Sequence, residues 1–234
     1  MPFLFFDPLY LLFIAPALIL GIIAQIMVGN AYRKYSRVRN ARGVSGAEAA
    51  QHLLLYNNIG EVNLEGTSGR MTDHYDPRSD TLRLSQGVAQ SPSVASLGIV
   101  AHEVGHAMQA HTGYALLRWR TSLVPAANIG SMAGPWLVLI GVIIQPFGFL
   151  AWLGVALFAV AAIFYLVTLP VELDASRRGI EMLEKSSLVV PEEVDGARKV
   201  LRAAAWTYVA ALLTAVMQLL YFGSLAAGGG RRRN

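Results

Sequence analysis

Residues 123–169 read LVPAANIGSMAGPWLVLIGVIIQPFGFLAWLGVALFAVAAIFYLVTL. This stretch holds two apolar runs, 123–145 and 149–169, separated by a short turn that contains Pro146 and Gly148. Neither run carries an acidic or basic side chain, and each is long enough to cross a bilayer core, which requires about 20 apolar residues. The pattern therefore predicts a transmembrane helical hairpin over residues 123–170.

Two further apolar segments flank this hairpin, at residues 1–29 and 203–227. The whole chain is 54% hydrophobic and only 15% charged, which exceeds the apolar fraction of an ordinary soluble domain. Basic residues follow the first segment instead of preceding it, which favours a membrane span over a signal peptide. We therefore predict a mainly α-helical, polytopic membrane protein with about four transmembrane helices and a flexible tail at 228–234.

The polar stretches 30–122 and 171–202 separate the predicted spans and should lie on one side of the membrane. All Lys and Arg residues other than the terminal three arginines fall in the polar stretches or at their boundaries. The positive-inside rule then places both stretches in the cytoplasm and the protein in the cell membrane. Because these basic residues accompany spans, we expect a lipid bilayer and no nucleic acid as partner. The absence of cysteine excludes disulfides and thiolate metal sites.

Two local patterns organise the first polar stretch. Residues 43–58 predict a short amphipathic helix, with Ser45 as its N-cap and Glu48 three residues later completing a capping box. Residues 62–85 alternate around Asp76-Pro77-Arg78-Ser79-Asp80 and predict two short strands joined by a turn. We therefore expect a catalytic part over 30–122 that contains a short β-hairpin.

The next helix carries an HExxH motif at residues 102–106. Ser91 is its predicted N-cap and Gly113 its predicted stop. Because a helix brings residues i and i+4 to one face, His102 and His106 can bind one Zn²⁺ ion.

Glu103 lies about 100° away on the helix and is placed to take a proton from water activated by the metal. The alternative is a chance match on a solvated or hydrogen-bonded face. Residues 94–101 are apolar or small, so the helix should be buried, where unpartnered His and Glu side chains would be costly.

A catalytic zinc site needs a third protein ligand. Glu172 and Asp174 lie in LPVELDASRRGIEML, residues 169–183, where the third span ends. The hairpin returns this segment to the membrane face of the HExxH helix. The two carboxylates are about 200° apart on a helix, so only one can face the ion, and the other would cap a helix or support a ligand. His111 comes one residue too early for the metzincin pattern.

Three segments together resemble the YugP-type neutral zinc metallopeptidases of bacterial membranes and, more distantly, the gluzincin membrane proteases of the HtpX and CAAX prenyl protease type. The segments are TDHYDPRSDTLRLS at 72–85, SVASLGIVAHEVGHAMQ at 93–109 and LPVELDASRRGIEML at 169–183. The resemblance implies a gluzincin-like fold with His102, His106 and Glu172 as zinc ligands and Glu103 as the catalytic glutamate. Ser176 stands where the wider pattern has an aspartate that orients a zinc histidine.

Metalloproteases of this kind lay an extended substrate along an edge strand, which the predicted hairpin resembles. A group that stabilises the oxyanion is also needed, and His74, Tyr75 and Arg177 are candidates among which the sequence does not choose.

The sequence thus predicts an integral membrane zinc metalloendopeptidase that acts on membrane or membrane-proximal proteins, with its active site on the cytoplasmic side. The alternative is a zinc-binding membrane scaffold or chaperone-like protein without catalysis, against which the intact Glu103 argues. A transporter would need charged residues in the hairpin, which has none. A membrane protein partner or a homo-oligomer stays open.

Overall fold

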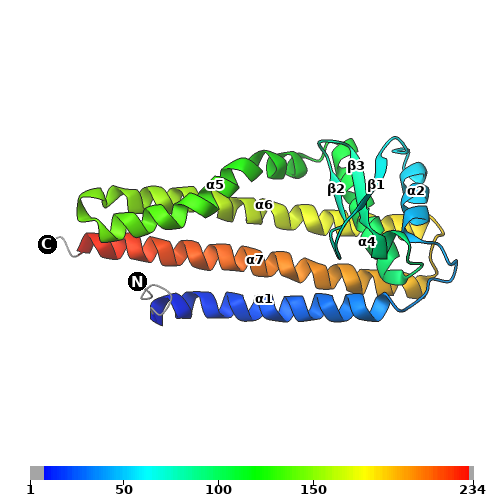
Figure 1. Cartoon of the computed structure of the whole chain (residues 1–234), viewed down its shortest axis with the longest axis horizontal. Helices are drawn as coiled ribbons and strands as arrows, with labels where there is room; N and C mark the ends of the chain where they lie inside the picture. The colour runs from blue at the N-terminus through cyan, green and yellow to red at the C-terminus, as the bar shows by residue number, and fades with distance from the viewer. Residues whose placement is uncertain (1–7, 232–234) are drawn as a thin grey trace. The chain divides into compact units, whose positions relative to one another are not determined.

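The computed structural model describes residues 8–231, which are mainly helical with one small sheet (Figure 1). The described residues form two compact units, the first from residues 8–23, 119–169 and 207–231, the second from 24–118 and 170–206. The elements are α1 (Pro8–Tyr35), α2 (Gly46–Tyr56), β1 (Asn63–Thr67), β2 (His74–Asp76), β3 (Thr81–Ser85), α3 (Gln86–Ala89), α4 (Val94–His111), α5 (Ala115–Ile143), η1 (Gln145–Phe147), α6 (Phe149–Lys185) and α7 (Pro191–Arg231).

Four of these helices, α1, α5, α6 and α7, are long and apolar enough to cross a membrane. Large hydrophobic side chains stand exposed on them, among them Leu12 and Met132, each more than 70% exposed. Such apolar surface is costly in water and suits contact with lipid. The prediction of a mainly helical protein with about four membrane spans is confirmed.

The first unit is built from apolar parts of these helices. Phe158 and Phe222 meet edge to face with their ring centroids 5.1 Å apart, and Tyr10 meets Tyr221 in the same way at 5.0 Å. A Cβ atom at Gly130 would lie 2.2 Å from the carbonyl oxygen of Leu157, so α5 and α6 approach each other backbone to backbone. Small residues permit such close packing of helices in membranes.

The helix boundaries depart from the sequence pattern in two ways. The helices α6 and α7 run without a break through the changes from apolar to polar sequence near residues 170 and 203, because a hydrogen-bonded helix continues across a change of side-chain polarity. The predicted N-cap of α4 at Ser91 is wrong by two residues. Ser93 has extended backbone and accepts the Ser96 N–H, while Pro92 still belongs to the preceding loop. Gly113, with φ +67°, ends the helix as predicted.

The second unit contains α2, α4 and a three-stranded sheet with the order β1-β3-β2. The capping box of α2 is present, since Ser45 and Glu48 bond each other's backbone N–H groups. Strands β2 and β3 form the predicted antiparallel hairpin, with Tyr75 opposite Leu82. Strand β1 pairs in parallel with β3, a partner that the sequence did not predict. Strand β2 therefore lies at one edge of the sheet.

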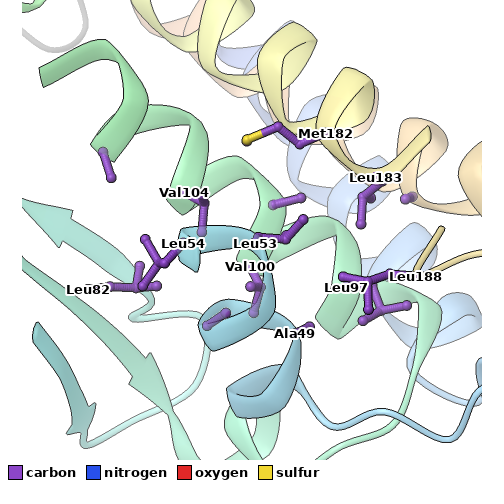
Figure 2. Packing of buried hydrophobic residues seen from close by; sticks show 14 of the residues in the cluster. Ala49, Leu53, Leu54, Leu82, Leu97, Val100, Val104, Met182, Leu183 and Leu188 are labelled. Atoms are coloured by element: carbon purple, nitrogen blue, oxygen red, sulfur yellow. The ribbon is translucent and has the colours of Figure 1, made fainter. Parts of the chain in front are cut away.

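A hydrophobic core holds α2, α4, the sheet and the polar end of α6 together (Figure 2). Leu53 of α2, Leu82 of β3, Leu97 and Val100 of α4 and Leu183 of α6 are all fully buried. Each such side chain contributes about 1.5–3 kcal/mol on burial. This core packs α4 against the end of α6 that follows Glu172.

Candidate metal centre

The two motif histidines lie together on one face of α4. The ring centroids of His102 and His106 are 4.8 Å apart, as expected of residues one helical turn apart. His106 is buried and His102 is partly exposed. The imidazoles of this pair are therefore largely shielded from solvent, with 14% of the His102 side chain and 10% of the His106 side chain exposed.

Glu172 of α6 completes a group of three. Its Oε2 lies 3.2 Å from Nε2 of His102 and 3.4 Å from Nε2 of His106. The three ligand atoms all lie within 4.8 Å of one another. Zinc bonds of about 2.0–2.2 Å place tetrahedral ligand atoms roughly 3.3–3.6 Å apart, so both distances from Glu172 to the histidines suit a zinc ion. Three such ligands would leave one coordination position for water or substrate.

Two glycines allow α4 and α6 to come this close. A Cβ atom at Gly105 would lie 2.4 Å from the carbonyl oxygen of Ala175. A Cβ atom at Gly179 would lie 2.6 Å from the carbonyl oxygen of Ala101. Only glycine permits this backbone separation, because a Cβ atom at either point would force the helices apart. The contact between the two backbones sets how α6 is rotated, and Glu172 therefore faces the histidines.

The second ring nitrogen of each histidine also has a partner. Nδ1 of His102 lies 3.0 Å from the Ser176 hydroxyl, the residue that the resemblance suggested for this role. Nδ1 of His106 lies 3.0 Å from Oε1 of Gln109. When Nε2 binds a metal, Nδ1 carries the proton and donates to these oxygens, which fixes the orientation of the ring.

Glu103 lies beside His102 and Glu172 in a buried position. Its Oε2 accepts a hydrogen bond of 3.0 Å from the backbone N–H of Tyr75 in β2. Burial raises the pKa of Glu103 to about 7, and the Glu172 charge adds to the effect, while His102 and the bond from Tyr75 act against it. A carboxyl group with such a pKa can exchange protons near neutral pH.

The three candidates for oxyanion stabilisation occupy different surroundings. The Tyr75 hydroxyl donates to Asp80 at 2.6 Å, and burial together with this bond raises the pKa of Tyr75. His74 is exposed on β2, with Nδ1 2.8 Å from the carbonyl oxygen of Thr72. Arg177 is largely exposed and forms ion pairs with Asp174 and Glu181. The structure thus places His74 and Tyr75 on the strand next to Glu103, and Arg177 among carboxylates of its own helix.

Two other residues weighed as ligands lie away from the histidine pair. Asp174 accepts a hydrogen bond of 2.9 Å from Gln109 and forms ion pairs with Arg177 and Arg178. His111 lies at the end of α4, where Nε2 is 3.1 Å from Asp80. Gln109, which bonds both Asp174 and His106, was not predicted as a site residue from the sequence. Its spacing of three from His106 on a buried helix face is the signal that could have found it.

A family model described as "Putative neutral zinc metallopeptidase" matches residues 10–227. The chain belongs to this zinc metallopeptidase family. Among curated proteins, this family member is 37% identical over 221 residues to the "Putative membrane protease YugP" of Bacillus subtilis (strain 168), across 94% of its own length and 98% of that protein. The comparison with solved structures found no match. The geometry of His102, His106 and Glu172 agrees with what the name of the zinc metallopeptidase family implies.

Proposed function

We propose that this membrane protein is a zinc endopeptidase in which His102, His106 and Glu172 hold the ion and Glu103 is the general base. The observation that carries the proposal is the convergence of the two imidazoles and the Glu172 carboxylate at distances of 3.2 and 3.4 Å, with a second carboxylate beside them. A structural zinc site normally has four protein ligands, whereas three leave a position for chemistry.

Zinc held there would supply a Lewis acid that polarises a peptide carbonyl and acidifies water. Glu103 is placed to accept the proton of the attacking water, since its carboxylate is buried beside His102 and Glu172. The same carboxyl group can then donate that proton to the departing amine. The N–H of Tyr75 holds the carboxylate in place for both steps.

Strand β2 supports the binding of an extended peptide. It lies at the edge of the sheet, and its Tyr75 is hydrogen-bonded to Glu103 itself. A substrate strand that adds to this edge would bring its backbone to the catalytic group. We assign His74 and Tyr75, on this strand, to the contact with substrate or transition state, and give Arg177 the lowest rank of the three.

The substrates that suit this position are membrane or membrane-proximal proteins. In α6, Glu172 follows the apolar run that ends at Leu169 by less than one helical turn, or roughly 5 Å along the helix axis. A site that close to a membrane span acts on chains near the lipid surface. The distribution of basic residues supports a cytoplasmic location for that surface.

The test compares purified wild-type protein with Glu103→Gln, both loaded with zinc, on casein and on a detergent-solubilised membrane protein. We expect equal zinc content and a loss of cleavage by about 10²–10⁴-fold in the variant. Glu184→Gln, which changes a partly exposed glutamate on α6 away from the site, is the control and should cleave normally. Equal cleavage by wild type and Glu103→Gln would end the proposal. Zinc binding without cleavage by the wild type would favour the scaffold alternative.

A further inference from the structure

Gln109 is a fully buried polar side chain next to the candidate metal centre. Burying an amide costs free energy unless its oxygen and both of its N–H groups find partners. Here the partners are present. Oε1 lies 3.0 Å from Nδ1 of His106, and Nε2 donates to the carbonyl oxygen of Val171 at 2.8 Å and to the Asp174 carboxylate at 2.9 Å. Each bond reaches a different group, and two of the three cross from α4 to α6.

The partners of the amide decide its orientation. The carbonyl oxygen of Val171 and the carboxylate of Asp174 are acceptors, so the NH₂ group must face them and the oxygen must face His106. An amide oxygen only accepts, and therefore Nδ1 of His106 must be the donor. A neutral imidazole that is protonated at Nδ1 presents the lone pair of Nε2, the atom that faces Glu172. Gln109 thereby selects the tautomer of His106 that can bind a metal.

Asp174 anchors this amide with a negative charge. Arg178 binds its carboxylate at 2.6 Å through Nε, and Arg177 forms a second ion pair with it. Arg178 is itself held, with its guanidinium 5.6 Å from the centre of the Tyr114 ring. A carboxylate that accepts the N–H bond of an amide polarises it and strengthens the bond that its oxygen accepts. The charge of Asp174 is thus transmitted through Gln109 to His106.

We propose that Gln109 is the positioning residue for His106, linking this imidazole to Asp174 so that Nε2 faces the metal position. The corresponding contact for His102 is direct, from Ser176. One stretch of α6 therefore supplies a ligand, Glu172, and the anchors of both histidines two and four residues later. This inference rests on the zinc site of the proposed function and does not depend on peptide cleavage.

The test measures the zinc affinity of the full-length protein by competition with a chromophoric chelator, and the visible spectrum after substitution with cobalt(II). Loss of a group that orients a metal-binding histidine weakens metal binding by about 10–100-fold, which we expect for Gln109→Leu. The cobalt spectrum should change as well, because the His106 ring is no longer fixed. Gln51→Leu, at an exposed glutamine of α2, is the control and should match the wild type.

A double-mutant cycle tests the link to Asp174. Asp174→Asn should weaken zinc binding in the wild type and have no further effect in Gln109→Leu, because its influence passes through the amide. Equal reductions in both backgrounds would overturn the link. If Gln109→Leu does not fold, Gln109→Glu replaces it in the test. Its carboxylate would lie beside that of Asp174 and repel it, so zinc binding should weaken. Adding Asp174→Asn supplies an amide N–H that can donate to the new carboxylate, so zinc affinity should recover in the double variant. Zinc affinity that fails to recover would refute the inference.

The outcomes separate this inference from the proposed function. A wild-type protein that binds zinc but cleaves nothing would end the peptidase proposal. Equal zinc affinity and equal cobalt spectra for wild type and Gln109→Leu would overturn the role of Gln109 alone. A wild type that binds no zinc would overturn both.

Discussion

The substitution Gly179→Ala tests whether the close contact of α4 and α6 positions the metal ligands. A Cβ atom at this glycine would lie 2.6 Å from the carbonyl oxygen of Ala101 and 3.0 Å from the backbone nitrogen of His102. Ordinary van der Waals contact begins at 3.4 Å, so the backbones must separate by the difference between 3.4 and 2.6 Å, about 0.8 Å. The shift acts at the turn of α4 that carries His102, a proposed zinc ligand.

Two effects on stability oppose each other in this variant. Overpacking of this kind costs about 1–3 kcal/mol of the free energy of unfolding. Replacing glycine by alanine inside a helix returns about 1 kcal/mol. We therefore expect a net destabilisation of about 0–2 kcal/mol, which leaves a folded protein whose metal site can be measured.

The effect on zinc should be larger than the effect on stability. A separation of about 0.8 Å would lengthen the bond between Nδ1 of His102 and the Ser176 hydroxyl from 3.0 Å to roughly 3.8 Å, beyond hydrogen-bond range. Glu172, now 3.2 Å from Nε2 of His102, would move away by a similar distance. Losing such an orienting contact lowers metal affinity by about 10–100-fold. Cleavage at limiting zinc should fall in proportion.

The assay is zinc competition together with thermal unfolding, and Gly87→Ala in α3 is the matched control. A Cβ atom at Gly87 would meet no atom within 4 Å, so this variant should keep the zinc affinity of the wild type. If Gly179→Ala also bound zinc and cleaved casein as the wild type does, the close approach of the helices would not be what positions the ligands.

Four further substitutions address the candidate site and the residues around it. Glu172→Ala should lose zinc, whereas Asp174→Ala should keep a weakened site, and metal content per chain distinguishes them. Ser176→Ala should lower zinc affinity by about tenfold in the same competition assay, and an unchanged affinity would remove its role. Burial raises the pKa of Asp80, but the hydrogen bonds from Tyr75 and His111 outweigh burial and hold this pKa below its ordinary value. The resulting stabilisation is complete above about pH 4 and is lost as the pH falls through the folded-state pKa, so acid should destabilise the wild type more than Asp80→Asn. Parallel acid-unfolding curves would contradict this.

Much of the fold could be predicted because its signals are local. Apolar runs of about 20 residues indicate membrane spans wherever they occur, and α1, α5, α6 and α7 contain them. The capping box of Ser45 and Glu48 and the turn between β2 and β3 also depend on neighbours in sequence. The start of α4 was misplaced because Ser91 and Ser93 are both suitable caps. A loop contact, the bond between Asn40 and Pro92, decides between them.

By itself the sequence determined the four apolar helices and the pairing of His102 with His106, since each depends only on residues within a single helix. Only the tertiary structure decided that Glu172 and not Asp174 faces the histidines, that Asp174 binds Gln109, and that the N–H of Tyr75 holds Glu103. These contacts join segments up to about 70 residues apart along the chain. Their geometry depends on how α4 and α6 are rotated against each other, which is set by close backbone contacts at two glycines and by a shared core. No local pattern specifies that rotation.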